Sequence, residues 1–196
     1  MKQFMVSLAS VAPYFQSRNY TMDEGAERHP KEGHGDYEKR IWRRRTHTDD
    51  DGQIVIPAEA FKMAIRDAAA YLSEKIPGRG RQTWTKHFRS GVLVSDGITL
   101  PERFENVEGV WLSLHANGRA NGGTRVWRCM PFVRRWAGDI TIIVLDDIIT
   151  EEILRRVVEH SGAFIGIGQN RPQNGGGHGR YQLVEMVAVE GGRAAA

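Results

Sequence analysis

Residues 150–186 read TEEILRRVVEHSGAFIGIGQNRPQNGGGHGRYQLVEM, and they place a glycine-rich loop between a helix and a strand. Thr150 is a favourable N-cap for the helix, and Gly162 is expected to end it. A short strand, AFIGI at 163–167, is predicted next, and RYQLVEMVAVE at 180–190 is predicted as the last strand. The elements on either side of this unit decide the fold.

Several strands precede this unit. DITIIVLDD at 139–147 is almost continuously apolar, which is typical of a central strand. GVLVSD at 91–96, VWLSLHA at 110–116 and TRVWRCMPFV at 124–133 are also predicted strands. NGRANGG at 117–123 is expected to form a turn or flexible tip.

The N-terminal part supplies one strand and one helix. QFMVSLASV at 3–11 alternates as a strand does, and Pro13 is expected to end it. IVIP at 54–57 leads into a helix whose apolar residues recur at helical spacing. Between them, residues 14–53 are polar and lack core periodicity, so we expect an excursion from the core. Within it, DYEKRIWRRR at 36–45 fits either a short basic helix or one arm of a hairpin.

This order reduces to βαββαβ, so the predicted fold class is α+β with a ferredoxin-like core. Such a core is an antiparallel sheet with two helices on one face, and its other face is free for a ligand, as in RNA-recognition sheets. We expect a single domain over 1–196, an insertion at 14–53 and a flexible tail at 191–196.

The bulk composition limits location and chemistry. No apolar run approaches the roughly 20 residues that span a bilayer, and the N-terminus lacks a signal-peptide pattern. We therefore expect an intracellular, cytoplasmic protein. Cys129 is the single cysteine, which excludes an internal disulfide and a cysteine-based metal site. The histidines and aspartates match no metal motif, and no Ser, Thr or Cys forms a visible triad, so no metal, cofactor or catalytic residue is predicted.

The net charge of +3 hides strong segregation. Residues 28–47 hold seven basic and three acidic side chains, residues 79–89 hold four basic and no acidic ones, and residues 119–135 hold five basic and no acidic ones. Aromatic residues are interleaved with these cations. Cations for phosphates and rings for bases are the groups that single-stranded nucleic acid requires. The alternative is a solvated charged surface over core aromatics.

The glycines at 166–180 favour close backbone approach and positive φ angles. Successive free N–H groups in such a loop would form an anion cradle, to which Arg171, His178 and Arg180 would add donors. The loop matches neither the Walker pattern nor the dinucleotide fingerprint. The alternative is a loosely ordered surface loop.

Two local patterns carry a family resemblance. IPAEAFKMAIRDAA at 56–69 and GIGQNRPQNGGGHGRYQL at 166–183 together cover about a sixth of the chain. They resemble the first-helix segment and the glycine-rich loop of the repeat-associated mysterious protein (RAMP) superfamily. These are ferredoxin-like proteins that bind RNA in CRISPR effector complexes. The loop departs from the pattern at QNRPQN.

The resemblance is closest in layout to the backbone subunit that polymerises along a guide RNA. Such subunits carry a long insertion after the first strand, which residues 14–53 match, although this chain is shorter than most of them. The resemblance implies that Lys62 and Arg66 face the strand and that the glycine loop packs against it. Stand-alone phage and prophage proteins are similar too, so single-stranded DNA stays open as the ligand.

The leading hypothesis is a non-enzymatic protein that binds single-stranded RNA or DNA and assembles head to tail into a filament. Tyr37, Trp42 or Trp84 would stack on bases. The alternatives are an endoribonuclease of the same fold, which needs a histidine, and a phage protein that binds another protein through its basic surface. The candidate nucleic-acid-binding residues are Arg18, Lys39, Arg40, Trp42, Arg43, Arg44, Arg45, Lys62, Arg66, Arg79, Arg81, Lys86, Arg171, Gly175, Gly176, Gly177, His178 and Arg180.

Overall fold

The structure is a computed structural model that describes residues 1–115 and 123–189. The predicted flexible tail and most of the predicted tip at 117–123 lie outside these residues. The strands are β1 (Lys2–Ser10), β2 (Tyr14–Phe15), β3 (Gln53–Ile56), β4 (Val92–Val94), β5 (Ile98–Arg103), β6 (Glu108–His115), β7 (Arg125–Val133), β8 (Ala137–Val144) and β9 (Tyr181–Val189). The α-helices are α1 (His34–Ile41), α2 (Ala58–Leu72), α3 (Thr85–Ser90) and α4 (Glu151–His160).

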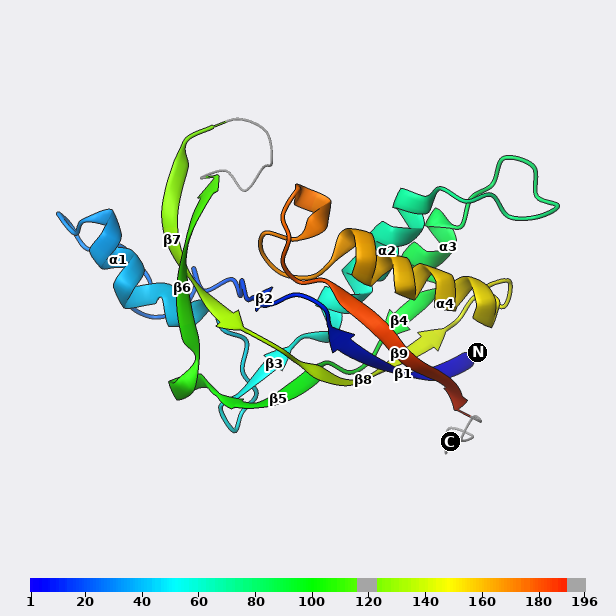
Figure 1. Cartoon of the computed structure of the whole chain (residues 1–196), viewed down its shortest axis with the longest axis horizontal. Coiled ribbons are helices and arrows are strands. Elements are labelled where there is room, and N and C mark those ends of the chain that lie inside the picture. The colour runs from blue at the N-terminus through cyan, green and yellow to red at the C-terminus, as the bar shows by residue number, and fades with distance from the viewer. Residues whose placement is uncertain (116–122, 190–196) are drawn as a thin grey trace.

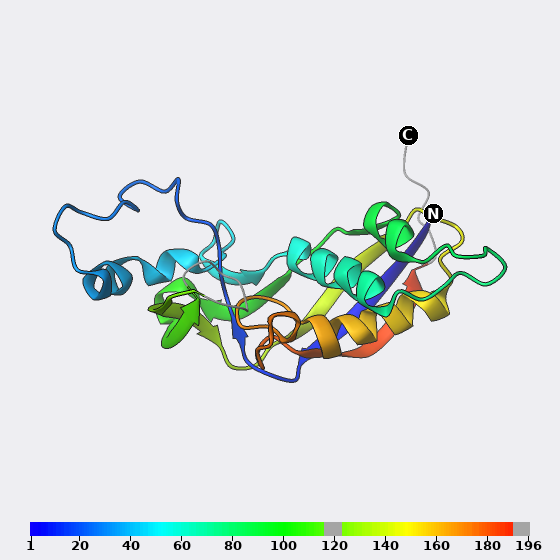
Figure 2. The same cartoon turned by 90° about the horizontal axis from the view of Figure 1, so that it is seen from above.

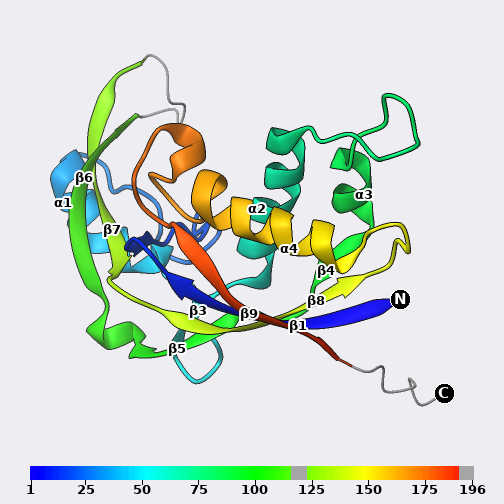
Figure 3. The ribbon, with the colours of Figure 1, turned by 45° about the vertical axis from the view of Figure 1, so that its right-hand side comes forward.

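The main sheet has the strand order β4-β8-β1-β9, and every neighbouring pair is antiparallel. Its helices lie on one face (Figures 1 and 3). Phe4, Val6 and Leu8 alternate along β1 and are buried, because successive side chains of a strand point to opposite faces. Figure 3 shows α2 and α4 packed over this sheet, so the core lies between the two layers.

A second sheet stands apart from the main one. The long β6–β7 hairpin pairs from Glu108 with Phe132 to His115 with Arg125, and β2 adds to its edge. The strands predicted at 110–116 and 124–133 are therefore present, but they pair with each other outside the main sheet. The basic segment at 36–45 takes the helical alternative. It forms α1 and a 3-10 turn, Trp42–Arg45, that contact β7.

The strand predicted for AFIGI is wrong, because α4 continues into a π-helical turn, Ser161–Ile165. This turn presses Gly162 against β9, where a Cβ on Gly162 would lie 2.0 Å from the carbonyl oxygen of Tyr181. Ser161 Oγ and Tyr181 Oη are hydrogen-bonded at 2.6 Å and fix the contact. The antiparallel pair of β3 and β5 was also missed, since β5 contains Pro101 and two charged residues.

No helix within residues 1–115 and 123–189 combines the length and the apolar character that crossing a bilayer demands.

Candidate nucleic-acid interface

The loop between α4 and β9 folds back tightly on itself. Gly179 has a φ of 72°, and a Cβ there would lie 1.9 Å from the carbonyl oxygen of Ile167. A Cβ on Gly176 would lie 1.8 Å from the carbonyl oxygen of Asn170. A side chain cannot approach backbone so closely, so both positions require glycine. Gly177 differs, because it is exposed and has open space around it.

Most amides of this loop are already used within the chain. Those of Gly175, Gly176 and His178 donate to carbonyl oxygens of the same loop. The amide of Gly179 donates to the carbonyl oxygen of Pro13 at 2.7 Å. The expected cradle of successive free N–H groups is therefore wrong at these four positions, because the loop uses its donors to hold its own shape.

His178 anchors this loop. Its ring packs against Phe15 with the ring centroids 4.7 Å apart, and its Nδ1 lies 2.9 Å from the side-chain amide nitrogen of Asn170. Burial lowers the pKa of His178 below its ordinary value, so the ring is neutral at neutral pH. A neutral imidazole adds no positive charge for a phosphate.

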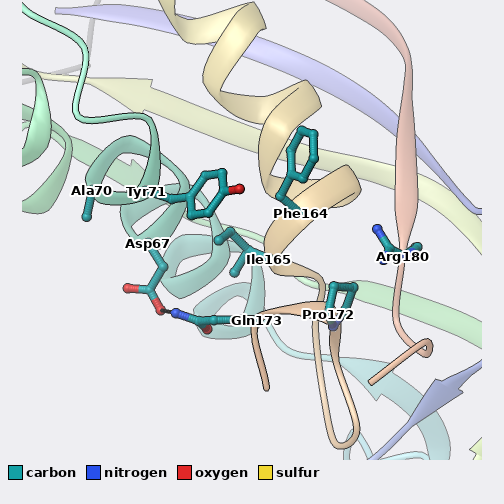
Figure 4. Close-up of a pocket in the computed structure, with 8 residues that line it drawn as sticks. All are labelled: Asp67, Ala70, Tyr71, Phe164, Ile165, Pro172, Gln173 and Arg180. Carbon is teal, nitrogen blue, oxygen red and sulfur yellow. Dashed lines mark hydrogen bonds between the residues drawn. The ribbon is translucent and has the colours of Figure 1, made fainter. Parts of the chain in front are cut away.

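Arg66 and Arg171 converge on one carboxylate. Arg66 Nη2 lies 2.7 Å from Asp67 Oδ1, and Arg171 Nη2 lies 3.9 Å from Asp67 Oδ2. Gln173 Nε2 donates to Asp67 Oδ2 at 3.2 Å and ties the loop to α2 (Figure 4). Two candidate arginines thus lie beside the loop, with a carboxylate that offsets part of their charge.

Arg180 lies at the end of the loop, directly before β9. Its Nη1 donates to the carbonyl oxygen of Ala163, and it forms no ion pair within the described part of the chain. It lines a cavity of about 450 Å³ that is also lined by Gln173, Tyr71 and Phe164 (Figure 4). The two aromatic residues were missed by the sequence analysis. Tyr71 lies off the apolar stripe of its helix, which is the signal that an exposed ring leaves in a sequence.

Much of the positive charge of residues 28–47 is offset inside the excursion. Arg40 Nε and Nη2 each lie 2.9 Å from a carboxylate oxygen of Glu32. The hydrogen bonds from Arg40 lower the pKa of the Glu32 carboxyl to about 2. Arg18 pairs with Asp23 in the same two-pronged way, with its nearest nitrogen–oxygen distance 2.7 Å.

Arg45 is a structural residue. It is 4% exposed, and its Nη1 and Nη2 lie 2.7 and 2.9 Å from the carboxylate oxygens of Glu38. Its Nη1 also donates to the carbonyl oxygen of Cys129 at 2.7 Å, which joins the 3-10 turn to β7. Separating a buried ion pair leaves an uncompensated charge, so this guanidinium is not available to a ligand. We therefore remove Arg45 from the candidate interface.

The remaining candidates of the excursion lie nearer the surface. Arg43 is exposed, and its guanidinium lies over the ring of half-buried Trp42 at 4.4 Å from the centroid. Lys39 is exposed and lies 3.5 Å from Asp36. Arg44 donates to a main-chain carbonyl oxygen at 2.6 Å. Of the candidate arginines in the excursion, Arg43 is the one whose guanidinium makes no polar contact among the described residues.

Lys62 is committed to the main chain. Its Nζ donates to the carbonyl oxygens of Phe88 and Arg89, both at 3.2 Å, and to that of Val92. Burial is the main cause that lowers the pKa of Lys62 below its ordinary value. This lysine holds α2 against α3 and β4, so its ammonium group does not project towards a ligand.

The cations of the second basic stretch, residues 79–89, are all exposed. Arg79 and Arg81 lie in the loop after α2, and Lys86 and Arg89 lie on α3. All four are exposed, and none forms an ion pair within the described part of the chain. Arg81, Lys86 and Arg89 line a cavity of about 330 Å³ with two threonines and a glutamine. Polar donors around a concavity without carboxylates suit an anion.

The candidate cations form three groups along the long axis. The excursion with α1 lies at one end, the loop between α2 and α3 at the other, and the glycine loop between them (Figures 1 and 2). The structure therefore does not gather all the candidates in one compact groove.

The open face of the main sheet is not basic. Met5 and Val187 are exposed and paired across β1 and β9. Asp139 and Glu185 flank Ser7 in the register, and Ser7 Oγ donates to Asp139 at 2.6 Å. The open-face positions of the described strands contain no lysine or arginine. Carboxylates repel phosphates, so this face does not fit the expected role of an RNA-recognition sheet.

His87 pairs with a carboxylate but is enclosed. His87 Nδ1 lies 2.6 Å from Asp146 Oδ2, but its Nε2 is buried without a hydrogen-bond partner and is closed to substrate. Trp84, beside His87, is 5% exposed, so the prediction that it stacks on bases is wrong. Within the described ranges, no three His, Cys, Asp or Glu side chains are grouped as a metal site requires.

Comparison with known proteins gives a likeness in fold. No family model and no curated protein matches the chain. Among solved structures, it is similar to a chain from the cryo-EM structure of the type III-B Cmr-beta bound to cognate target RNA, with a TM-score of 0.51 and 12% sequence identity. The match covers 96% of this chain and 61% of that one, so this chain spans about three fifths of its neighbour's length.

Proposed function

We propose that this protein binds single-stranded nucleic acid, RNA or DNA, as a non-enzymatic member of the RAMP superfamily. The observation that carries the proposal is the cavity lined by the exposed cations Arg81, Lys86 and Arg89, which form no ion pair among the described residues. Phosphates that bind such cations release condensed counterions, which is the main source of non-specific affinity.

The fold supports this assignment. The chain order β1, α2, β4, β8, α4, β9 and the sheet order β4-β8-β1-β9 support the proposed ferredoxin-like βαββαβ core. The similar chain comes from a structure that contains bound target RNA. That chain is longer, so its place in its own complex is not transferred to this protein.

The placement of the cations supports head-to-tail assembly. The excursion and the loop between α2 and α3 project at opposite ends of the molecule (Figure 2). A contact between two different surfaces generates a filament when the rotation between copies does not close a ring. Bound strands would then run from the cations of one copy towards those of the next.

The test begins with the nucleic acid that copurifies with the protein, digested separately with RNase and DNase. Fluorescence anisotropy with labelled single strands of increasing length then measures affinity at several salt concentrations. We expect affinity to rise with length and to fall steeply with salt. An affinity that is unchanged between low and moderate salt would overturn the proposal. Protein that remains monomeric on long strands would overturn head-to-tail assembly alone.

A further inference from the structure

Three aromatic rings from separate elements form a stack on the helix side of the molecule. The rings of Tyr71 and Phe164 are 5.6 Å apart between centroids at an interplanar angle of 20°. His160 stacks on Phe164 at 5.4 Å and 29°. Tyr71 ends the stack and is 63% exposed, and Phe164 is 47% exposed. Large rings exposed side by side are typical of binding surfaces, whereas single exposed rings are ordinary.

The backbone explains why these rings face outwards. Tyr71 lies on the last turn of α2, while Phe61, Ile65 and Ala68 of the same helix are buried. Phe164 lies in the π-helical turn, which buries its neighbour Ile165 and leaves Phe164 at the surface. Such turns are often found at functional sites, because they move a side chain out of the regular helical face.

A cavity of about 450 Å³ adjoins this stack, and its lining is mixed. Tyr71, Phe164 and Arg180 all line the cavity, and in Figure 4 Phe164 lies between the other two. Gln173 lies on the loop side, where its amide nitrogen is held by Asp67. Arg180 uses one nitrogen on the carbonyl oxygen of Ala163. Its guanidinium thus retains donors for an anion in a cavity that two aromatic side chains also line.

We propose that an unpaired base of the bound strand stacks on Tyr71 in this cavity, with its phosphate on Arg180. This inference rests on the proposed function and adds the place where a base is held. A flat apolar ring joined to an anion matches aromatic faces beside a cation, which is how sequence-tolerant single-strand binders hold bases. Purines should bind more tightly than pyrimidines here, because they offer more surface for stacking.

The experiment compares the unaltered chain with Tyr71→Ala and Phe164→Ala on one labelled single strand. A second set of strands lacks the base at each position in turn. We expect each alanine variant to lose about 5-fold to 150-fold in affinity, the range measured for one stacked base. The dependence of affinity on salt should not change, because no charge is removed. Tyr71→Phe keeps the ring and should bind as the unaltered chain does.

The strands that lack a base make the test specific. If a base lies on Tyr71, removing it at the contacting position weakens the unaltered chain but adds little to Tyr71→Ala, because the two losses report one interaction. Additive losses at every position, or full affinity of both folded alanine variants, would overturn the stacking site while salt-dependent binding stands. Absence of any strand binding by the unaltered chain would overturn both proposals. Circular dichroism and melting temperature confirm folding of each variant.

Discussion

Replacing Arg81, Lys86 and Arg89 together by glutamine is the most direct test of the electrostatic interface. The three cations line one cavity and are exposed, and glutamine keeps much of their length and polarity. None of them forms an ion pair in the described residues, so the change breaks no internal salt bridge. We therefore expect the stability of the fold to change little and the affinity for single strands to fall.

The magnitude follows from counterion release. On single strands, each neutralised phosphate contributes about 0.7 to the slope of log affinity against log salt concentration. If each cation neutralises one phosphate, the triple variant loses about 2 units of slope. The ratio of the affinity of the unaltered chain to that of the triple variant should then fall about 20-fold between about 50 mM and about 200 mM salt.

Anisotropy titrations at a series of salt concentrations measure this slope directly. The matched control replaces Arg103, Arg134 and Arg155 by glutamine. It removes the same net charge from surface arginines that already lie within 3.7, 2.8 and 3.5 Å of a carboxylate oxygen. An equal loss of slope in both triple variants would show that net charge alone matters and would refute the assigned interface.

Three further outcomes follow from the structure. Gly176→Ala should lower the free energy of unfolding by about 1–3 kcal/mol through overpacking, whereas Gly177→Ala, which meets open space, should change it little in urea titrations. Glu38→Ala should lower it by about 3–5 kcal/mol, because Arg45 is left buried and unpaired; retained stability there would contradict a structural ion pair. The folded-state pKa of Glu32 is lowered from 4.5 to about 2. Its stabilising contribution is therefore present above pH 4.5 and is lost as the pH falls towards 2. Urea titrations at a series of pH values, which give the free energy of unfolding, measure this loss.

Periodicity in the sequence was sufficient for the elements that face one continuous core. The alternation at 3–11 places Phe4, Val6 and Leu8 on one side, and the structure buries all three. The apolar stripe of the helix that begins after Pro57 likewise predicted the buried face of that helix. The sequence patterns predict the buried residues of these elements because each element packs against a single apolar layer.

AFIGI shows where the same approach fails. Ile165 and Ile167 are both buried, and their spacing of two residues is the mark of a strand. Here it arises in a π-helical turn that presses Gly162 on β9, a tertiary contact with no local pattern. The glycines after it also served a different purpose from the one expected, since backbone packing and anion binding favour the same residue type.

The availability of the charged side chains was the hardest property to predict, because the sequence shows how many there are but not which of them form ion pairs. Arg45 and Glu38 are seven residues apart, and Arg40 and Glu32 are eight apart, so neither pair follows a helical spacing rule. The excursion supplies seven of the candidate residues, but three of its arginines, Arg18, Arg40 and Arg45, are paired with carboxylates of the excursion. In the shorter stretch at 79–89, Arg81, Lys86 and Arg89 line one cavity and form no ion pair among the described residues.

The distribution of charge gives the molecule two chemically different sides. The open face of the main sheet presents Asp139 and Glu185 beside the exposed apolar Met5 and Val187, so it repels a polyanion. The cavities lined by cations, together with the exposed aromatic stack, lie on the helix side. Under the proposed function, we therefore expect a single strand to cross the helices and the glycine loop, where Arg180 lines the cavity of the stack.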